Sequence, residues 1–163
     1  MIVVSDTSPL LSLIYLHQLH LLSLLFKEVI IPVGVETELL NSRISDEQKQ
    51  YLKNQKWVRV QSPENLAEVS RIVSRDIHLA EAQAIVLAKE LHADYLLIDE
   101  QLGRAVASSE GLLIVGVLGV LLRAKKENHI AAIKPMMDVL IAKTGFWISE
   151  PLYKRVLQLA GEV

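Results

Sequence analysis

Residues 1–13 read MIVVSDTSPLLSL, and the turn inside this stretch decides how the fold is interpreted. Ile2 to Val4 is a β-branched run typical of a buried strand, and the leucine-rich segment from Pro9 is typical of a helix. We expect Ser8 to cap this helix and Pro9 to occupy its first position. Asp6 therefore lies where a strand turns into a helix, the place at which open α/β sheets bind ligands. The same position suits an acid that only stabilises a helix N-terminus, so Asp6 by itself leaves both roles open.

The composition limits the class of protein. The 163 residues fit one domain, and 51% apolar with 22% charged residues is typical of a globular chain. The net charge of −2 means that nucleic acid would need a local basic patch. Cysteine is absent, which excludes disulfides and fits a reducing compartment. Residues 9–26 include polar side chains and are marginal in length for a membrane span, and no signal peptide is recognisable. We expect a cytoplasmic protein without membrane contact.

The remaining apolar runs predict a parallel sheet. Strands are expected at 29–31, 57–61, 95–98 and 112–116, and continuous apolar runs such as YLLI and LLIV are typical of strands covered on both faces. Helices are expected over 9–25, after Pro32, and over 46–54, 63–74, 79–91, 100–110, 117–126, 130–143 and 151–159. This order predicts a three-layer α/β/α sandwich with a mostly parallel central sheet. With no linker or repeat, we predict a single domain over residues 1–163, completed by the helices from about 117.

A second acid repeats the position of the first. Asp99 ends the apolar run YLLID and precedes a helix that we expect to stop at Gly111. Adjacent strands of a parallel sheet present their carboxyl ends on one edge, so Asp6 and Asp99 can lie side by side. Two independent helix-capping acids would explain the pattern equally well. Glu100 is read more simply as an acid at the start of the following helix.

Two helices supply further candidates. Glu81 shares its helix face with Ala84, Ile85 and Ala88, and an ionised carboxylate facing a core is costly unless it is paired or binds a metal. In the stretch IPVGVETELL, a helical wheel places Glu36 inside the apolar arc and Glu38 at its border. Periodicity alone therefore favours Glu36.

Several carboxylates without a counter-charge repel one another, and a hard divalent cation would relieve that repulsion. An all-oxygen ligand set is typical of Mg²⁺ or Mn²⁺ sites that hold substrate phosphates. The pattern therefore indicates metal-assisted hydrolysis of a phosphodiester.

At this point the sequence resembles the PIN-domain family, the fold of the VapC-type toxin ribonucleases. The matching features are the strand ending in Asp6 with Thr7 and Ser8, the pair Glu38-Leu39, and the run EAQAIVLAKELHADYLLID, with eighteen residues from Glu81 to Asp99. Family members generally carry Asp at the position of Glu81, so Glu is a departure, although a chemically equivalent one. The closing stretches GVLGVLLRAKKENHIAAIKPMMDVL and TGFWISEPLYKRVLQLAGE resemble a poorly characterised prokaryotic branch of the family.

The resemblance implies an acidic pocket formed by Asp6, Glu38, Glu81 and Asp99 around Mg²⁺ or Mn²⁺. Asp6, Glu81 and Asp99 would be metal ligands, and Glu38, in preference to Glu36, would be a ligand or would position the attacking water. Thr7 and Ser8 would support the ligands through their hydroxyls, although helix capping is an equally good role for them.

Three functions follow from these residues. The first is a metal-dependent endoribonuclease acting on single-stranded or structured RNA, as the toxin of a toxin–antitoxin pair held inactive by a small antitoxin protein. The second is a catalytically weak nucleic-acid-binding or regulatory PIN module, which the acidic composition favours. The third is a nuclease acting on DNA.

A few other side chains bear on these functions. Arg104, one turn after Asp99, could contact phosphate, and Arg123, Lys125 and Lys126 form a basic cluster that a solvated helix face explains equally well. Leucine-rich stripes are most simply core, with any excess available for a homodimer. His17 and His20 form an H-x-x-H pair that lacks a third zinc ligand.

Overall fold

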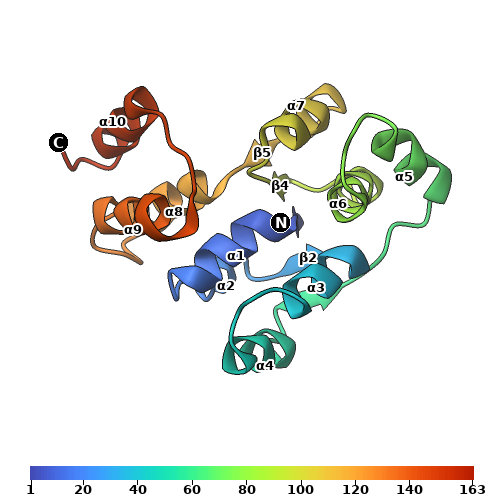
Figure 1. Ribbon diagram of the computed structural model, residues 1–163, viewed down its shortest axis with the longest axis horizontal. Coiled ribbons are helices and arrows are strands. Elements are labelled where there is room, and N and C mark those ends of the chain that lie inside the picture. The colour runs from blue at the N-terminus through green and yellow to red at the C-terminus, as the bar shows by residue number, and fades with distance from the viewer.

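A five-stranded parallel sheet lies at the centre of the computed structural model, which describes residues 1–163 (Figure 1). The strands are β1 (Val3–Ser5), β2 (Val29–Ile31), β3 (Val58–Val60), β4 (Tyr95–Leu97) and β5 (Ile114–Val115). They are arranged in the order β3-β2-β1-β4-β5, and every pairing is parallel. The predicted three-layer α/β/α sandwich is confirmed, with β1 at the middle of the sheet.

Alternating side chains of the strands enter two separate cores. One core takes Val3, Val29, Ile31 and Leu97, and the other takes Val4, Ile30, Leu96 and Ile98. Because successive strand residues point to opposite faces, a run that is apolar at every position must be covered on both sides. The continuous apolar runs of the sequence are explained by this burial.

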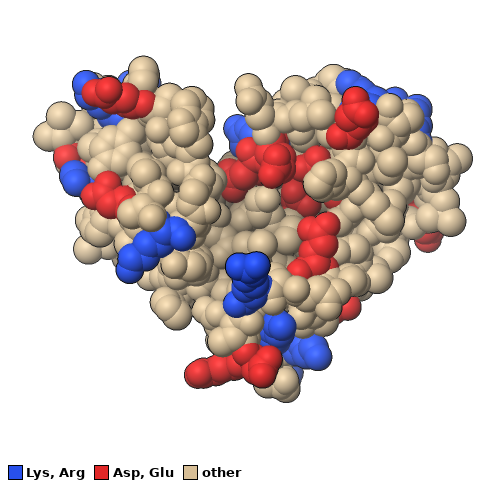
Figure 2. All heavy atoms as spheres, in the orientation of Figure 1, with Lys and Arg blue, Asp and Glu red and all other residues tan.

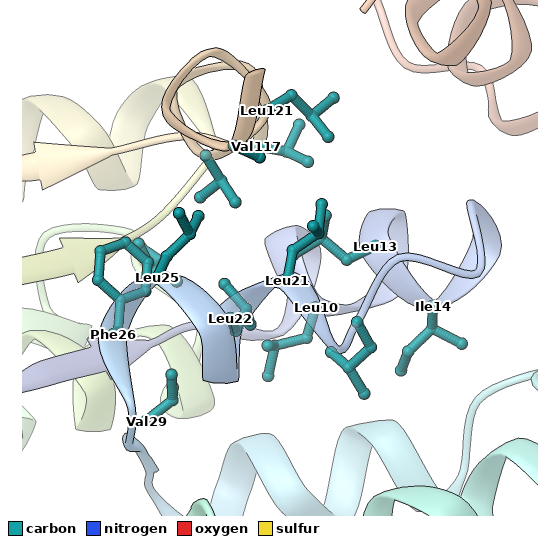
Figure 3. Close-up of a cluster of buried hydrophobic side chains, with 14 of the residues drawn as sticks. Leu10, Leu13, Ile14, Leu21, Leu22, Leu25, Phe26, Val29, Val117 and Leu121 are labelled. Atoms are coloured by element: carbon teal, nitrogen blue, oxygen red, sulfur yellow. The ribbon is translucent and has the colours of Figure 1, made fainter. Parts of the chain in front are cut away.

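The first core joins the sheet to helices from both ends of the chain. These helices are α1 (Thr7–Tyr15), α2 (Leu21–Phe26), α3 (Val33–Leu40), α4 (Asp46–Asn54), α8 (Val117–Lys126), α9 (Lys134–Thr144) and α10 (Glu150–Leu159). Figure 3 shows side chains of α1, α2 and α8 meeting in this core. The second core is covered by α5 (Leu66–Val73), α6 (Leu79–Glu90) and α7 (Gln101–Ser109). No helix is long and apolar enough to cross a membrane.

The helix predicted over residues 9–25 is wrong in two respects. It begins at Thr7 with Asp6 as the N-cap residue, and Pro9 fits its first turn because the N–H groups there have no partner inside the helix. It also breaks after Tyr15, since His17 adopts a left-handed conformation with φ of 56°. The amide of Gln18 then donates to the Leu13 carbonyl at 2.8 Å, which closes α1 with a Schellman motif. α2 is a separate helix that begins at Leu21. His17 and His20 therefore do not share a helix.

The register of β1 against β4 positions the two aspartates. Ser5 is paired with Leu97, and the amide of Asp6 donates to the Leu97 carbonyl at 2.9 Å. Asp6 and Asp99 thus leave the sheet at the carboxyl ends of adjacent strands. Gly111, with φ of 84°, follows the end of α7 as predicted.

Candidate metal-binding active site

Asp6 is buried at the carboxyl end of β1. Although it is the N-cap residue of α1, its side chain makes no capping hydrogen bond, and only 4% of the residue is exposed. Burial raises the pKa of Asp6 to about 6, and the charge of Glu38 contributes to the increase. The Thr7 amide at the start of α1 opposes this increase, so the carboxylate is buried beside the helix end and near the acids of other elements.

Glu81 lies beside Asp6 from the first turn of α6. It is 8% exposed, as its position among apolar residues predicts. Burial, followed by the charges of Asp6 and Glu100, raises the pKa of Glu81 to about 8, and a hydrogen bond from the protonated acid to Asp6 contributes. Its carboxyl group rests against Gly103 of α7, where a Cβ would lie only 2.7 Å from the Glu81 Oε2 atom. A side chain at position 103 would therefore displace this carboxylate or the Ile98 side chain.

The structure distinguishes between the two acids of α3. Glu38 is exposed, yet its charge raises the pKa of both Asp6 and Glu81. Glu36 is half-buried and has no such effect on either group. Glu38 is therefore the α3 acid whose charge reaches Asp6 and Glu81, while Glu36 lies on the more buried side of the helix, where the helical wheel places it.

Asp99 is held separately at the start of α8. Its carboxylate accepts a hydrogen bond from the Val117 amide at 3.1 Å, and a Cβ on Gly116 would lie 2.5 Å from its Oδ1 atom. Burial raises the pKa of Asp99 to about 6, opposed by this amide and by the charge of Arg104. Arg104 donates to the Ile98 carbonyl at 2.9 Å, so part of its guanidinium is occupied in holding the β4 end.

Glu100 is the acid whose role sequence reasoning underestimated. It is the exposed N-cap residue of α7 and makes no side-chain capping bond. Its charge raises the pKa of Asp6, Glu81 and Asp99, and no other acid acts on all three. The only feature of the sequence that could have indicated this role is the position of Glu100 directly after Asp99.

These five acids, Asp6, Glu38, Glu81, Asp99 and Glu100, are called the acidic cluster below. None of them is in an ion pair, whereas acids elsewhere, such as Glu68 and Glu110, pair with Arg71 and Lys89. Figure 2 shows acidic side chains gathered in a hollow near the middle of one face, over the region of β4 and the start of α7 in Figure 1. Burial is the main cause of the raised pKa values of Asp6, Glu81 and Asp99, and the charges of neighbouring acids add to it.

The acidic cluster fits a hard divalent cation held by few protein ligands. The Thr7 Oγ1 atom, next to Asp6, is buried without a hydrogen-bond partner. No three His, Asp or Glu side chains lie close enough together to hold a metal ion among them. Asp6 and Glu81 form the close pair, and Mg²⁺ typically uses one or two carboxylates and keeps several waters. Ser8 is half-buried and lies on a groove beside α1.

The basic cluster predicted at Arg123, Lys125 and Lys126 lies in the last turn of α8. Arg123 pairs with Glu127 and covers the Phe26 ring at 5.0 Å, and Lys125 pairs with Glu162 at 2.8 Å. These contacts fix α8 in the first core, so a structural role accounts for both residues.

The structure is a parallel α/β sandwich with buried carboxylates at the carboxyl edge of its sheet. A family model described as a PIN domain matches residues 2–162, and the chain belongs to this family. PIN domains are typically nucleases and generally use divalent metal ions. No curated protein matches the chain.

Proposed function

We propose that this protein is a Mg²⁺- or Mn²⁺-dependent endoribonuclease that hydrolyses RNA phosphodiester bonds. The observation that carries the proposal is the acidic cluster, in which five acids without ion-pair partners meet at one edge of a PIN-domain sheet. Such an arrangement destabilises the fold unless it serves a bound cation.

The close pair of Asp6 and Glu81 would hold the cation directly, and Asp99 would be a further ligand through a bound water. A divalent cation supplies charge neutralisation to phosphodiester hydrolysis. Glu38 is exposed at the rim of the pair, where it would orient the attacking water and accept its proton. The hydroxyl of Thr7 has no partner and would support a ligand of the site. The guanidinium of Arg104, anchored on the Ile98 carbonyl, would contact a phosphate of the substrate with its free N–H groups.

The proposal extends to a toxin role in which a small antitoxin protein blocks the site. The resemblance to VapC-type toxins supports it, and exposed apolar side chains such as Leu66, Leu113 and Trp147 are available for an antitoxin or a homodimer. Light scattering of the purified protein tests the homodimer, and identification of a small co-purifying protein that inhibits cleavage tests the antitoxin.

A catalytically weak nucleic-acid-binding module is the second candidate, and the charge balance favours it. Of the 17 Lys and Arg residues, eight are already in ion pairs: Arg59, Arg71, Arg75, Lys89, Arg123, Lys125, Lys134 and Lys154. A module of this kind would bind RNA without cutting it.

Cleavage of single-stranded and structured RNA with Mn²⁺ separates the two candidates. We expect cleavage by the wild type, none in EDTA, and none by Asp6→Asn. Glu36→Gln is the matched control, because it neutralises an acid of α3 outside the acidic cluster. Cleavage that persists in EDTA or in Asp6→Asn would refute the proposal. Binding without cleavage would favour the second candidate.

A further inference from the structure

A groove of about 1390 Å³ runs between α1, α4 and α9. Apolar side chains such as Leu11, Ile14 and Met136 line it. It starts at Ser8, two residues after Asp6, and continues along α1. The helix that begins at the acidic cluster therefore forms one wall of the groove.

The charge of the groove is opposite to that of the acidic cluster. Arg43 and Lys143 line it, both are exposed, and neither is in an ion pair. His17 and His20 add imidazole donors, and Glu47 is the only acid in the lining. In a chain with net charge −2, this is a local excess of positive charge that suits an anionic ligand. Figure 2 shows basic side chains beside α9 and near the α3–α4 connection, on the face that carries the acidic hollow.

Aromatic rings line the same groove as these cations. Tyr15 of α1 is 45% exposed and Tyr51 of α4 is 42% exposed, and Phe146, after α9, also lines the groove. Exposed rings next to Lys and Arg are typical of sites for single-stranded nucleic acid, where bases stack on rings and phosphates meet cations. An amphipathic helix of a protein would also fit an apolar groove. Ser8 of the groove lies two residues after Asp6 on α1, and this proximity favours a strand that passes from the groove toward the acidic cluster.

We infer that this groove binds the single-stranded RNA next to the bond that is cut. Phosphates would contact Arg43 and Lys143, and bases would stack on Tyr15 and Tyr51. The inference rests on the proposed function for the identity of the ligand, and it adds the surface along which the single strand would reach the acidic cluster.

Fluorescence anisotropy with a labelled oligouridylate of about 12 nucleotides measures this binding without cleavage. All proteins carry Asp6→Asn and are kept in EDTA. The groove variant is Arg43→Glu with Lys143→Glu, and the matched control is Lys53→Glu with Lys56→Glu, which makes the same charge change at exposed lysines outside the groove. We expect the groove variant to lose about tenfold or more in affinity, and its salt slope to fall by about 1.4, since each contact to a single strand contributes about 0.7.

Tyr51 supplies a second comparison that does not change charge. Tyr51→Ala should bind the oligouridylate at least about fivefold more weakly, whereas Tyr51→Phe keeps the ring and should bind like the parent. Thermal melting of every variant verifies that it is folded.

Equal affinity of the groove variant and its control would overturn the inference, even if the wild type cleaves RNA. An altered oligomeric state in light scattering, at unchanged RNA affinity, would assign the groove to contacts between copies and would overturn it too. Selective loss of RNA binding by the groove variant would support it. If that loss is seen while the wild type fails to cleave RNA with Mn²⁺, the groove stands and the nuclease proposal fails.

Discussion

Replacing Glu81 by Gln should stabilise the metal-free protein at high pH. In the folded state the pKa of Glu81 is raised to about 8, from an ordinary value of 4.5, by burial and by the charges of Asp6 and Glu100. An acid whose pKa is higher in the folded state than in the unfolded state stabilises the fold fully at a pH below its unfolded-state pKa. This stabilisation is lost as the pH rises to the folded-state pKa. The wild type should therefore lose stability between about pH 4.5 and pH 8, whereas Glu81→Gln has no proton to lose there.

The size of the effect follows from the same pKa values. Each pH unit between them is worth about 1.4 kcal/mol, which gives an upper bound of about 5 kcal/mol. We expect roughly 2 kcal/mol, because water reaches the hollow and Asp6 shares the proton. Gln keeps an N–H donor for Asp6, so the two proteins should be equally stable near pH 5.

Urea denaturation in EDTA, at about pH 5 and about pH 9, measures the difference. Glu81→Gln should exceed the wild type by about 2 kcal/mol at the higher pH, which corresponds to about 4 to 8 °C in Tm. Glu36→Gln, outside the acidic cluster, should show no such gain. A Glu81→Gln protein no more stable than the wild type at about pH 9 would refute the claim that this carboxylate is buried at a cost.

Three further predictions follow from the geometry. Gly103→Ala places a Cβ 2.7 Å from the Glu81 Oε2 atom, so it should weaken Mn²⁺ binding about tenfold or more in calorimetry. The control is Gly111→Ala, where the new Cβ meets no other atom; it should leave Mn²⁺ binding unchanged, although the φ of 84° at this position is strained for alanine. Arg104→Gln removes the positive charge that opposes the raised pKa of Asp99, so cleavage should require a higher pH than in the wild type, and an identical pH profile would count against that role. Burial tends to raise the pKa of Glu110, but its ion pairs with Arg71 and Lys89 lower that pKa overall. In urea denaturation, Glu110→Gln should therefore lower the free energy of unfolding by about 1 kcal/mol near pH 7, and by nothing at a pH below the folded and unfolded pKa values of Glu110. An equal loss at both pH values would contradict the stabilising role of these ion pairs.

The parts of the fold that the sequence predicted best are those in which local and global signals agree. The apolar runs of β1 and β4 are each followed by an acid and a helix, and parallel pairing then places Asp6 and Asp99 at one edge. The break at His17 was missed because a leucine-rich segment gives the same periodic signal on both sides of it, and no Gly or Pro marks the left-handed residue.

The acidic cluster was only partly predictable for a related reason. A helical wheel finds the side chains that face a core, and Glu81 does so. Glu38 and Glu100 lie at the exposed rim, where periodicity carries no information. Gly103 and Gly116 were overlooked because their role is to leave space for a carboxylate from another element, and such close approach appears only in three dimensions.

Calorimetric titration with Mn²⁺ is the measurement that tests the acidic cluster most directly. We predict a single divalent-cation site in the wild type and in Glu36→Gln, and none in Asp6→Asn. Binding that is unchanged by Asp6→Asn, or no binding to the wild type at about millimolar Mn²⁺, would contradict the claim that these carboxylates gather around a cation.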